Sequence, residues 1–139
     1  MRALGIDFGT VRIGVAVSDD KMSLASALTT IEYPKNNYQY VIDQLRLIIK
    51  RYEVELIVLG YPTLPDGAKT KITLLVDSFH ERLKKSFKDI KIILWDEVNS
   101  TKETVSELKE VAELRGSQIK KVKDKLAAQR ILQSYLESK

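Results

Sequence analysis

Three acidic residues, far apart in the sequence, stand where predicted elements begin or end: Asp7, Glu97 and Asp124. Asp7 ends one apolar run, Glu97 follows another, and Asp124 precedes an amphipathic segment. A carboxylate at the end of a buried strand is costly without a partner. Carboxylate oxygens suit Mg²⁺ or Mn²⁺, which leave open positions for phosphate oxygens. The acids predict a site that hydrolyses phosphodiester bonds of nucleic acid, in which two ions about 4 Å apart activate water and stabilise the leaving oxygen.

Each acid also has a simpler explanation. Asp7 could make an Asx turn before the glycine turn that follows it. One of Asp96 and Glu97 could serve only as a helix cap, and Asp124 could complement a helix dipole. Taken together, the three acids favour the metal site, because it explains all of them at once.

The basic residues concentrate around Asp124. The segment around Asp124 contains five basic residues and one acid, so its net charge is +4. The whole chain also has a net charge of +4, so the rest of the chain is neutral. A basic patch around a metal ligand predicts contact with a polyanion. A solvated lysine-rich loop between residues 116 and 125 is the alternative. The five residues are Arg115, Lys120, Lys121, Lys123 and Lys125.

Composition limits the remaining classes. The 139 residues predict a single domain, 1–139. There is no cysteine, which excludes disulfides, thiolate zinc sites and cysteine nucleophiles. No signal peptide or membrane span is predicted, so we expect a soluble, cytoplasmic protein. The only histidine, His80, is expected at the surface, and Trp95 in the core.

The periodicity of apolar residues predicts a mixed five-stranded α/β sheet with helices on both faces. Sites in such sheets form beyond the carboxyl ends of strands. Asp7 and Glu97 therefore share a crevice if the first and fifth strands lie near each other, with Asp124 leaning over it. Strands are expected at 2–7, 12–18, about 24–33, 56–59 and 90–95. Helices are expected at 38–52 and 69–87. A third helix is expected to begin at a capping box at Ser100 and to end at a C′ residue, Gly116, and a fourth to begin at about residue 124.

Four motifs, DFGTVRIGVAVSD, GYPTLPDG, DEVNST and VKDKLAAQRILQSYL, resemble those of the YqgF family of Holliday-junction-resolvase-like proteins. The resemblance covers nearly the whole chain. It implies a ribonuclease-H-like fold and a nuclease that processes the 5′ end of precursor 16S rRNA, with resolution of DNA junctions as the alternative. It also implies metal-ligand roles for Asp7, Glu97 and Asp124. Arg12 and Gly14 match its Arg-Ile-Gly element, and Gly60, Pro62, Asp66 and Gly67 match a loop that borders the substrate groove.

Two departures from the family pattern affect the expected site. Val98 stands where the family usually has an arginine, whose guanidinium could clamp phosphate. Either Arg12 or the lysines around Asp124 compensate, or activity and substrate preference differ. No acid stands at Ala127 or Ala128, so the fourth carboxylate of junction resolvases is missing unless Asp96 supplies it. This weighs more against a resolvase than against a nuclease.

Two other classes compete with the nuclease. Asp-Phe-Gly-Thr resembles the phosphate-binding hairpin of ATP-dependent kinases and actin-like ATPases, but those need a second such hairpin, which is not found. A non-catalytic nucleic-acid-binding module would need only the basic patch. The expected partners are structured RNA, or else branched DNA, and ribosomal precursor particles, with no membrane. The oligomeric state stays open.

Overall fold

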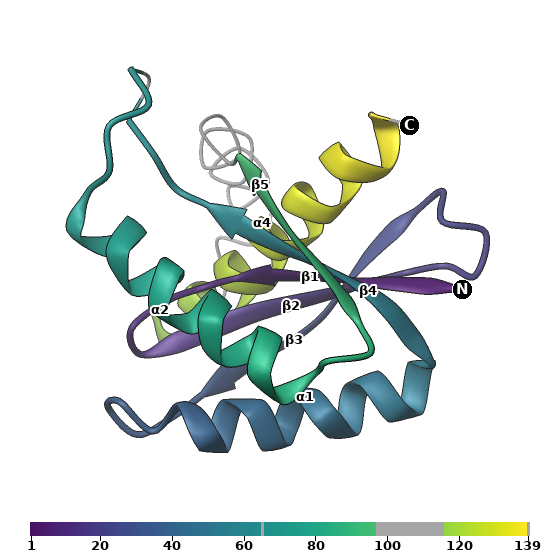
Figure 1. Cartoon of the computed structure of the whole chain (residues 1–139), viewed down its shortest axis with the longest axis horizontal. Coiled ribbons are helices and arrows are strands. Elements are labelled where there is room, and N and C mark those ends of the chain that lie inside the picture. The colour runs from purple at the N-terminus through teal and green to yellow at the C-terminus, as the bar shows by residue number, and fades with distance from the viewer. Residues whose placement is uncertain (65, 97–115, 139) are drawn as a thin grey trace.

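The computed structural model describes residues 1–64, 66–96 and 116–138. They form one five-stranded sheet, in the order β3-β2-β1-β4-β5, with helices on both faces (Figure 1). The first three strands are antiparallel, and β1, β4 and β5 are parallel. The predicted mixed α/β sheet is therefore confirmed. The elements are β1 (Arg2–Asp7), β2 (Arg12–Ser18), β3 (Ala25–Glu32), α1 (Tyr38–Tyr52), β4 (Val54–Tyr61), α2 (Lys71–Ser86), β5 (Lys91–Asp96) and α4 (Gly116–Glu137).

Alternation along the strands divides the core into two layers. On one face, Leu4 and Ile6 of β1 pack in a cluster with Leu45 of α1 and Phe79 of α2. On the other face, Ala3 of β1 packs in a second cluster with residues of α4. Helices α1 and α2 thus cover one side of the sheet, and α4 covers the other.

On β1 and β2 the face beneath α4 carries small residues, so that the helix lies very close to these strands. A Cβ atom on Gly14 of β2 would lie 1.8 Å from the backbone oxygen of Asp124. A Cβ on Gly5 of β1 would lie 2.7 Å from Cβ of Leu132. Both distances are impossible for real side chains, so glycine at these positions permits the seating of α4.

Caps explain where the two helices of the other layer begin. Asn37 accepts a hydrogen bond from the Tyr40 amide at 3.1 Å and starts α1. Thr70 and Thr73 form a reciprocal capping box, so α2 begins at Lys71 rather than at the predicted residue 69. Strand β4 is longer than the predicted 56–59, because backbone pairing with β1 and β5 extends it at both ends.

The expected basic loop before the last helix is wrong. Helix α4 begins at Gly116, so Lys120, Lys121, Lys123 and Lys125 are all helical. Lysine is a good helix former, and packing on the sheet holds this segment in place. The helix expected between Ser100 and Gly116 lies outside the described residues, apart from Gly116 itself. Within the described part of the chain, no helix has the length and apolar character needed to cross a membrane.

Candidate functional site

Asp7 ends β1 on the face that α4 covers. Strand alternation assigns it to that face, together with Ala3 and Gly5. Its register partner on β2 is Gly14, the residue over which the backbone of Asp124 passes. Asp7 and Asp124, 117 positions apart in the printed sequence, therefore both neighbour Gly14.

Arg12 forms an ion pair with the second of these acids, Asp124. Its Nε donates to Oδ2 of Asp124 at 2.8 Å, and the two side chains are only 28% and 22% exposed. Arg12 lies two residues before Gly14 on the same strand face. Three side chains of the opening and closing motifs thus gather around a glycine that has no side chain of its own.

The position of Asp124 within α4 also removes a simpler explanation for it. Asp124 lies more than two turns after the start of the helix. A stabilising interaction with the helix dipole falls off within the first turn. The expectation that Asp124 stands at the head of a helix is wrong, and so is the dipole as the reason for its presence.

Burial dominates the electrostatics of Asp124. Partial burial raises the pKa of its carboxyl group above the ordinary value, while Arg12 and Lys123 act in the opposite direction without cancelling the rise. The folded chain therefore holds a proton on Asp124 to higher pH than the unfolded chain does. A bound cation would favour the ionised form, as a metal ligand requires.

The carboxyl ends of β1, β4 and β5 lie at the same edge of the sheet, because the three strands are parallel. Strand β4 separates the first strand from the fifth, which places their ends about 10 Å apart. Glu97 lies outside the described residues, so its role as a third ligand stays a prediction.

Asp96 lies on the wrong face to join Asp7 and Asp124. The preceding residue, Trp95, faces α4, because its Nε1 donates to Oγ of Ser134 at 3.1 Å. Trp95 also packs edge-on against Tyr135, with ring centroids 5.4 Å apart. It is half-buried at the margin of the second core cluster and not within the buried core that the sequence predicted. Alternation directs Asp96 to the opposite face of β5. The arrangement argues against Asp96 as the fourth ligand.

The donor set fits a hard divalent cation. Carboxylate oxygens of Asp7 and Asp124 are the type that Mg²⁺ and Mn²⁺ prefer. Among residues 1–64, 66–96 and 116–138, no three His, Asp or Glu side chains cluster as a metal site. The described chain thus supplies two of the three predicted ligands, which could hold an ion that polarises a phosphodiester bond and activates water.

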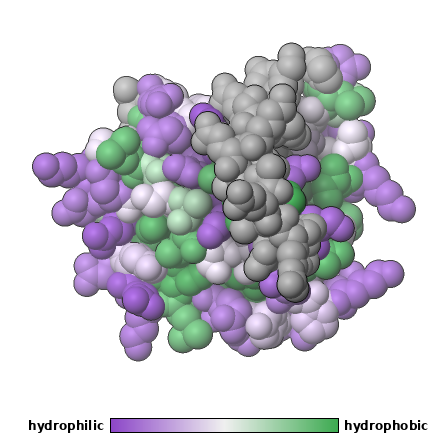
Figure 2. All heavy atoms as spheres, turned by 180° about the vertical axis from the view of Figure 1, so that it is seen from behind, coloured by the Kyte–Doolittle hydropathy of each residue, from purple (hydrophilic) through white to green (hydrophobic). Residues whose placement is uncertain are grey.

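The residues predicted to contact nucleic acid differ in whether they already form an ion pair and in how exposed they are. Arg12 is committed to Asp124, and Nζ of Lys121 pairs with Oε1 of Glu32 at 2.8 Å. Lys120 and Lys123 are exposed, and Lys125 is half-buried. Figure 2, which shows the molecule from behind, has hydrophilic side chains around the rim of this view.

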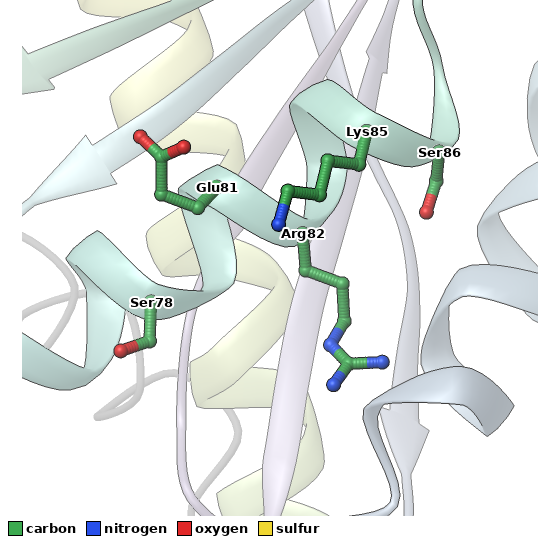
Figure 3. Close-up of a pocket in the computed structure, with 5 residues that line it drawn as sticks. All are labelled: Ser78, Glu81, Arg82, Lys85 and Ser86. Atoms are coloured by element: carbon green, nitrogen blue, oxygen red, sulfur yellow. The ribbon is translucent and has the colours of Figure 1, made fainter.

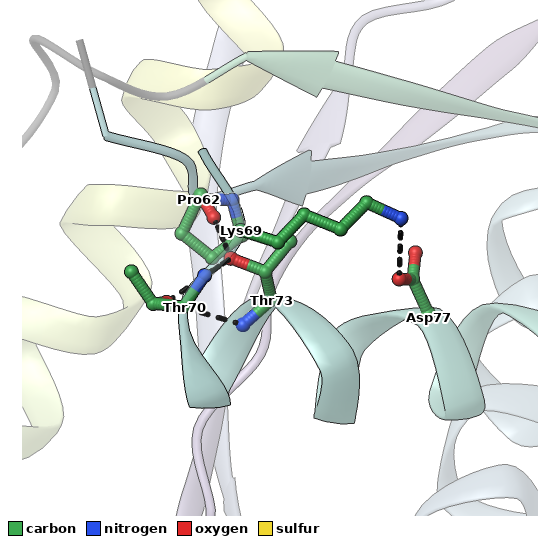
Figure 4. A network of polar contacts seen from close by, with 5 residues as sticks. All are labelled: Pro62, Lys69, Thr70, Thr73 and Asp77. Atoms are coloured by element: carbon green, nitrogen blue, oxygen red, sulfur yellow. Dashed lines mark hydrogen bonds and ion pairs between the residues drawn. The ribbon is translucent and has the colours of Figure 1, made fainter. Parts of the chain in front are cut away.

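The loop after β4 is tied to the start of α2 at the same sheet edge. Oγ1 of Thr73 donates to the carbonyl of Pro62, and Nζ of Lys69 lies 3.2 Å from Oδ2 of Asp77 (Figure 4). Asp66 accepts from the Ala68 amide at 2.9 Å. In this tight turn Gly67 has a φ of 83°, a value that favours glycine. Gly60 belongs to β4 itself. The role of this loop as a border of the substrate groove stays a prediction.

His80 is not the simple surface residue that the sequence predicted. It is half-buried in α2, and its Nε2 is buried without a hydrogen-bond partner among the described residues. Burial lowers the pKa of its imidazole. His80 follows the fully buried Phe79, which draws this part of the helix against the sheet.

Comparisons with known proteins agree with the motifs. A family model described as "RuvX: Holliday junction resolvase" matches residues 1–138. The chain belongs to this family. The resemblance to YqgF proteins is thereby confirmed.

Named relatives match over almost their whole length. A protein of Mycoplasmopsis synoviae is 41% identical over 137 residues, 99% of this chain and 98% of the relative. One of Thermoanaerobacter pseudethanolicus is 41% identical over 138 residues, 99% of this chain and 97% of the relative. Both carry the name "Putative pre-16S rRNA nuclease".

Solved structures confirm the ribonuclease-H-like fold. RuvC of T. thermophilus in complex with a Holliday junction substrate superposes with a TM-score of 0.62 at 14% identity, covering 99% of this chain and 94% of RuvC. The Fowlpox virus resolvase with Holliday junction DNA gives a TM-score of 0.60 at 15% identity, covering 99% and 98%. At such identities the likeness concerns the fold.

Proposed function

We propose that this RuvX-family protein is a divalent-metal-dependent endonuclease, a single ribonuclease-H-like domain that processes the 5′ end of precursor 16S rRNA. Asp7, Glu97 and Asp124 would hold Mg²⁺ or Mn²⁺. The observation that carries the proposal is the seating of Asp124 on Gly14, beside Asp7 and paired with Arg12. The names of relatives at about 40% identity supply the RNA substrate. The cytoplasmic location and binding to ribosomal precursor particles stay predictions.

The carboxylates, Arg12 and the exposed lysines have different roles at this site. The carboxylates would hold the ion, and such an ion would supply polarisation of the phosphodiester bond and activation of water. Arg12 fixes the orientation of Asp124 through its Nε and offsets part of the cost of burying that carboxylate. The exposed Lys120 and Lys123 attract the phosphate backbone to the same face.

Cleavage of end-labelled RNA tests the proposal. Purified protein and its Asp7→Asn variant are incubated with a structured precursor-rRNA fragment or a four-way DNA junction, in Mg²⁺, Mn²⁺ or EDTA. We expect metal-dependent RNA cleavage that Asp7→Asn lowers by at least about 100-fold, since even outer-shell changes at metal sites cost 10- to 100-fold. Metal-free binding should be equal or tighter, because the variant removes a negative charge that faces phosphate.

Asp43→Asn, at an exposed position of α1, is the matched control and should cleave normally. Equal cleavage by Asp7→Asn would contradict the site. Cleavage of the junction alone would assign the chain to the resolvases, and binding without cleavage under every condition would favour the non-catalytic module.

A further inference from the structure

A groove lined by cations follows the C-terminal half of α2 and reaches the C-terminal half of α1 beyond the end of α2, on the face opposite α4. Two adjoining pockets of about 350 and 240 Å³ form it, and both include Ser86. In Figure 3, Arg82 and Lys85 extend from α2 beside one of these pockets. We call this surface the basic groove. Its cations are Arg46 and Lys50 of α1, Arg82 and Lys85 of α2, and Lys88 in the turn that follows.

Positive charge in the basic groove is in excess and available. All five cations are exposed. The groove has two acids, Glu81 and Asp89, and Glu81 pairs with Lys84, a residue that does not line it, at 2.7 Å. None of the five cations takes part in an ion pair with another residue of the described ranges.

Aromatic rings hold the two arginines in place. The guanidinium of Arg46 lies 5.0 Å from the ring centroid of Phe87, and that of Arg82 lies 5.7 Å from that of Tyr38. Each contact joins α1 to the α2 segment. A guanidinium stacked on a ring keeps its N–H edges for hydrogen bonds to phosphate, with less rotamer freedom left to lose on binding.

The dipoles of the two helices explain only part of this charge. Lys50 and Lys85 lie in the last turns of α1 and α2, where cations are favourable. Arg46 and Arg82 lie earlier in their helices, and Lys88 follows the end of α2. Their convergence on one groove calls for a second reason.

We infer that the basic groove binds the phosphate backbone of RNA at a distance from the cleaved bond. This inference deepens the proposed function and rests on its RNA substrate. Helices α1 and α2 end where β4 and β5 begin, whereas Asp7 stands where β1 ends. The groove therefore lies across the sheet and on the order of 20 Å along it from Asp7. Only a large or folded RNA reaches both surfaces.

Metal-free binding tests the inference without requiring cleavage. Lys50→Gln with Lys85→Gln is compared with a control pair, Lys21→Gln with Lys84→Gln. The control removes the same charge, and Lys84 shares the last turn of α2 but is paired with Glu81. Binding in EDTA is measured against salt for a structured precursor-rRNA fragment and for a single-stranded octanucleotide, with thermal melting to show that each variant is folded.

We expect the groove pair to bind the long RNA about 10-fold more weakly near 0.1 M salt. Its salt slope should fall by about 1.4, or about 0.7 for each lost phosphate contact. The octanucleotide, which is too short to follow the surface around an edge of the sheet from one face to the other, should bind almost as before. The control pair should keep the parental slope with both probes.

An unchanged salt slope for the long RNA would overturn the inference, and an acidic protein surface would then be the alternative ligand of the basic groove. An equal loss with both probes would also overturn it, because the effect would then be general. Failure of the parent protein to cleave any substrate would contradict the proposed function, whereas the difference between the two RNA probes would still decide the groove.

Discussion

The ion pair between Arg12 and Asp124 joins the two most distinctive motifs of the chain. Burial outweighs the guanidinium in this pair, so the pKa of Asp124 is shifted upward. Ionisation of Asp124 as pH rises through this raised pKa therefore costs the folded chain stability. A divalent ion bound to the carboxylate would relieve that cost, which couples metal binding to the protonation of one side chain.

Arg12→Gln should raise the pKa of Asp124 further, because it removes the positive charge and keeps the burial. Metal binding needs the ionised carboxylate, so the pH below which cleavage and Mn²⁺ binding fail should move upward. The measurements are kcat/KM and Mn²⁺ affinity between pH 5 and 8, with Arg12→Lys as the control that retains the charge. An acid limb at the same pH in all three proteins would show that Arg12 does not set the ionisation of Asp124.

At the scale of elements, the site depends on how closely α4 approaches β1 and β2. Gly14 and Gly5 leave no side chain between sheet and helix. The carboxylate of Asp124 is thereby carried to the strand that pairs with the one ending at Asp7. The same contact is part of the second core layer, so the position of a candidate ligand and the packing of the fold are not independent.

Gly14→Ala should displace α4, because its Cβ would meet the Asp124 backbone oxygen at 1.8 Å. Overpacking of this kind costs about 1–3 kcal/mol of unfolding free energy, or more where backbone must move. Cleavage should fall further than the loss of folded protein explains, since Asp124 moves. Denaturant unfolding and cleavage rate are the two measurements.

Gly5→Ala is the comparison for this variant. Its Cβ would meet Leu132 and Ala128, farther along α4 from Asp124. It should also destabilise the protein but retain more activity per folded molecule than Gly14→Ala. Equal losses of activity per folded molecule in the two variants would contradict a specific role for the contact at Gly14.

At the scale of the whole molecule, two sets of exposed cations lie on opposite faces of the sheet. One set belongs to the first turns of α4 and the other to the basic groove of α1 and α2. Layers of side chains separate the sets, so substitutions in one should act independently of those in the other. An RNA that touches both sets must wrap around an edge of the sheet.

Neutralising Lys120, Lys121 and Lys123 together should weaken RNA binding and lower its salt slope by about 2. Lys120 and Lys123 are expected to contribute most, because Lys121 already pairs with Glu32. Combined with the groove pair, the losses in binding free energy should add for the long RNA. The control is again Lys21→Gln with Lys84→Gln. An unchanged salt slope would show that the three lysines are solvated and do not contact the RNA.

Local pattern in the sequence was enough to locate several strands and helices. Strands 2–7 and 12–18 and helix 38–52 are found where alternation, helical periodicity and caps predicted them. The sequence also indicated Asp7 and Asp124 as partners, through chemistry and family resemblance. The predicted start of α4 was wrong, because a run of lysines is typical of a solvated loop and only the packing of this segment on the sheet shows that it is helical.

Features that depend on contacts between distant segments became visible only in the folded chain. The pairing of Arg12 with Asp124 joins positions 112 residues apart, and no local pattern specifies it. The place of β4 between β1 and β5 and the burial of His80 Nε2 are of the same kind. Strand alternation, helical periodicity and helix caps depend on interactions between residues close in the sequence, and can therefore be recognised without the fold. The raised pKa of Asp124 and the basic groove depend instead on which distant segments the folded chain brings together.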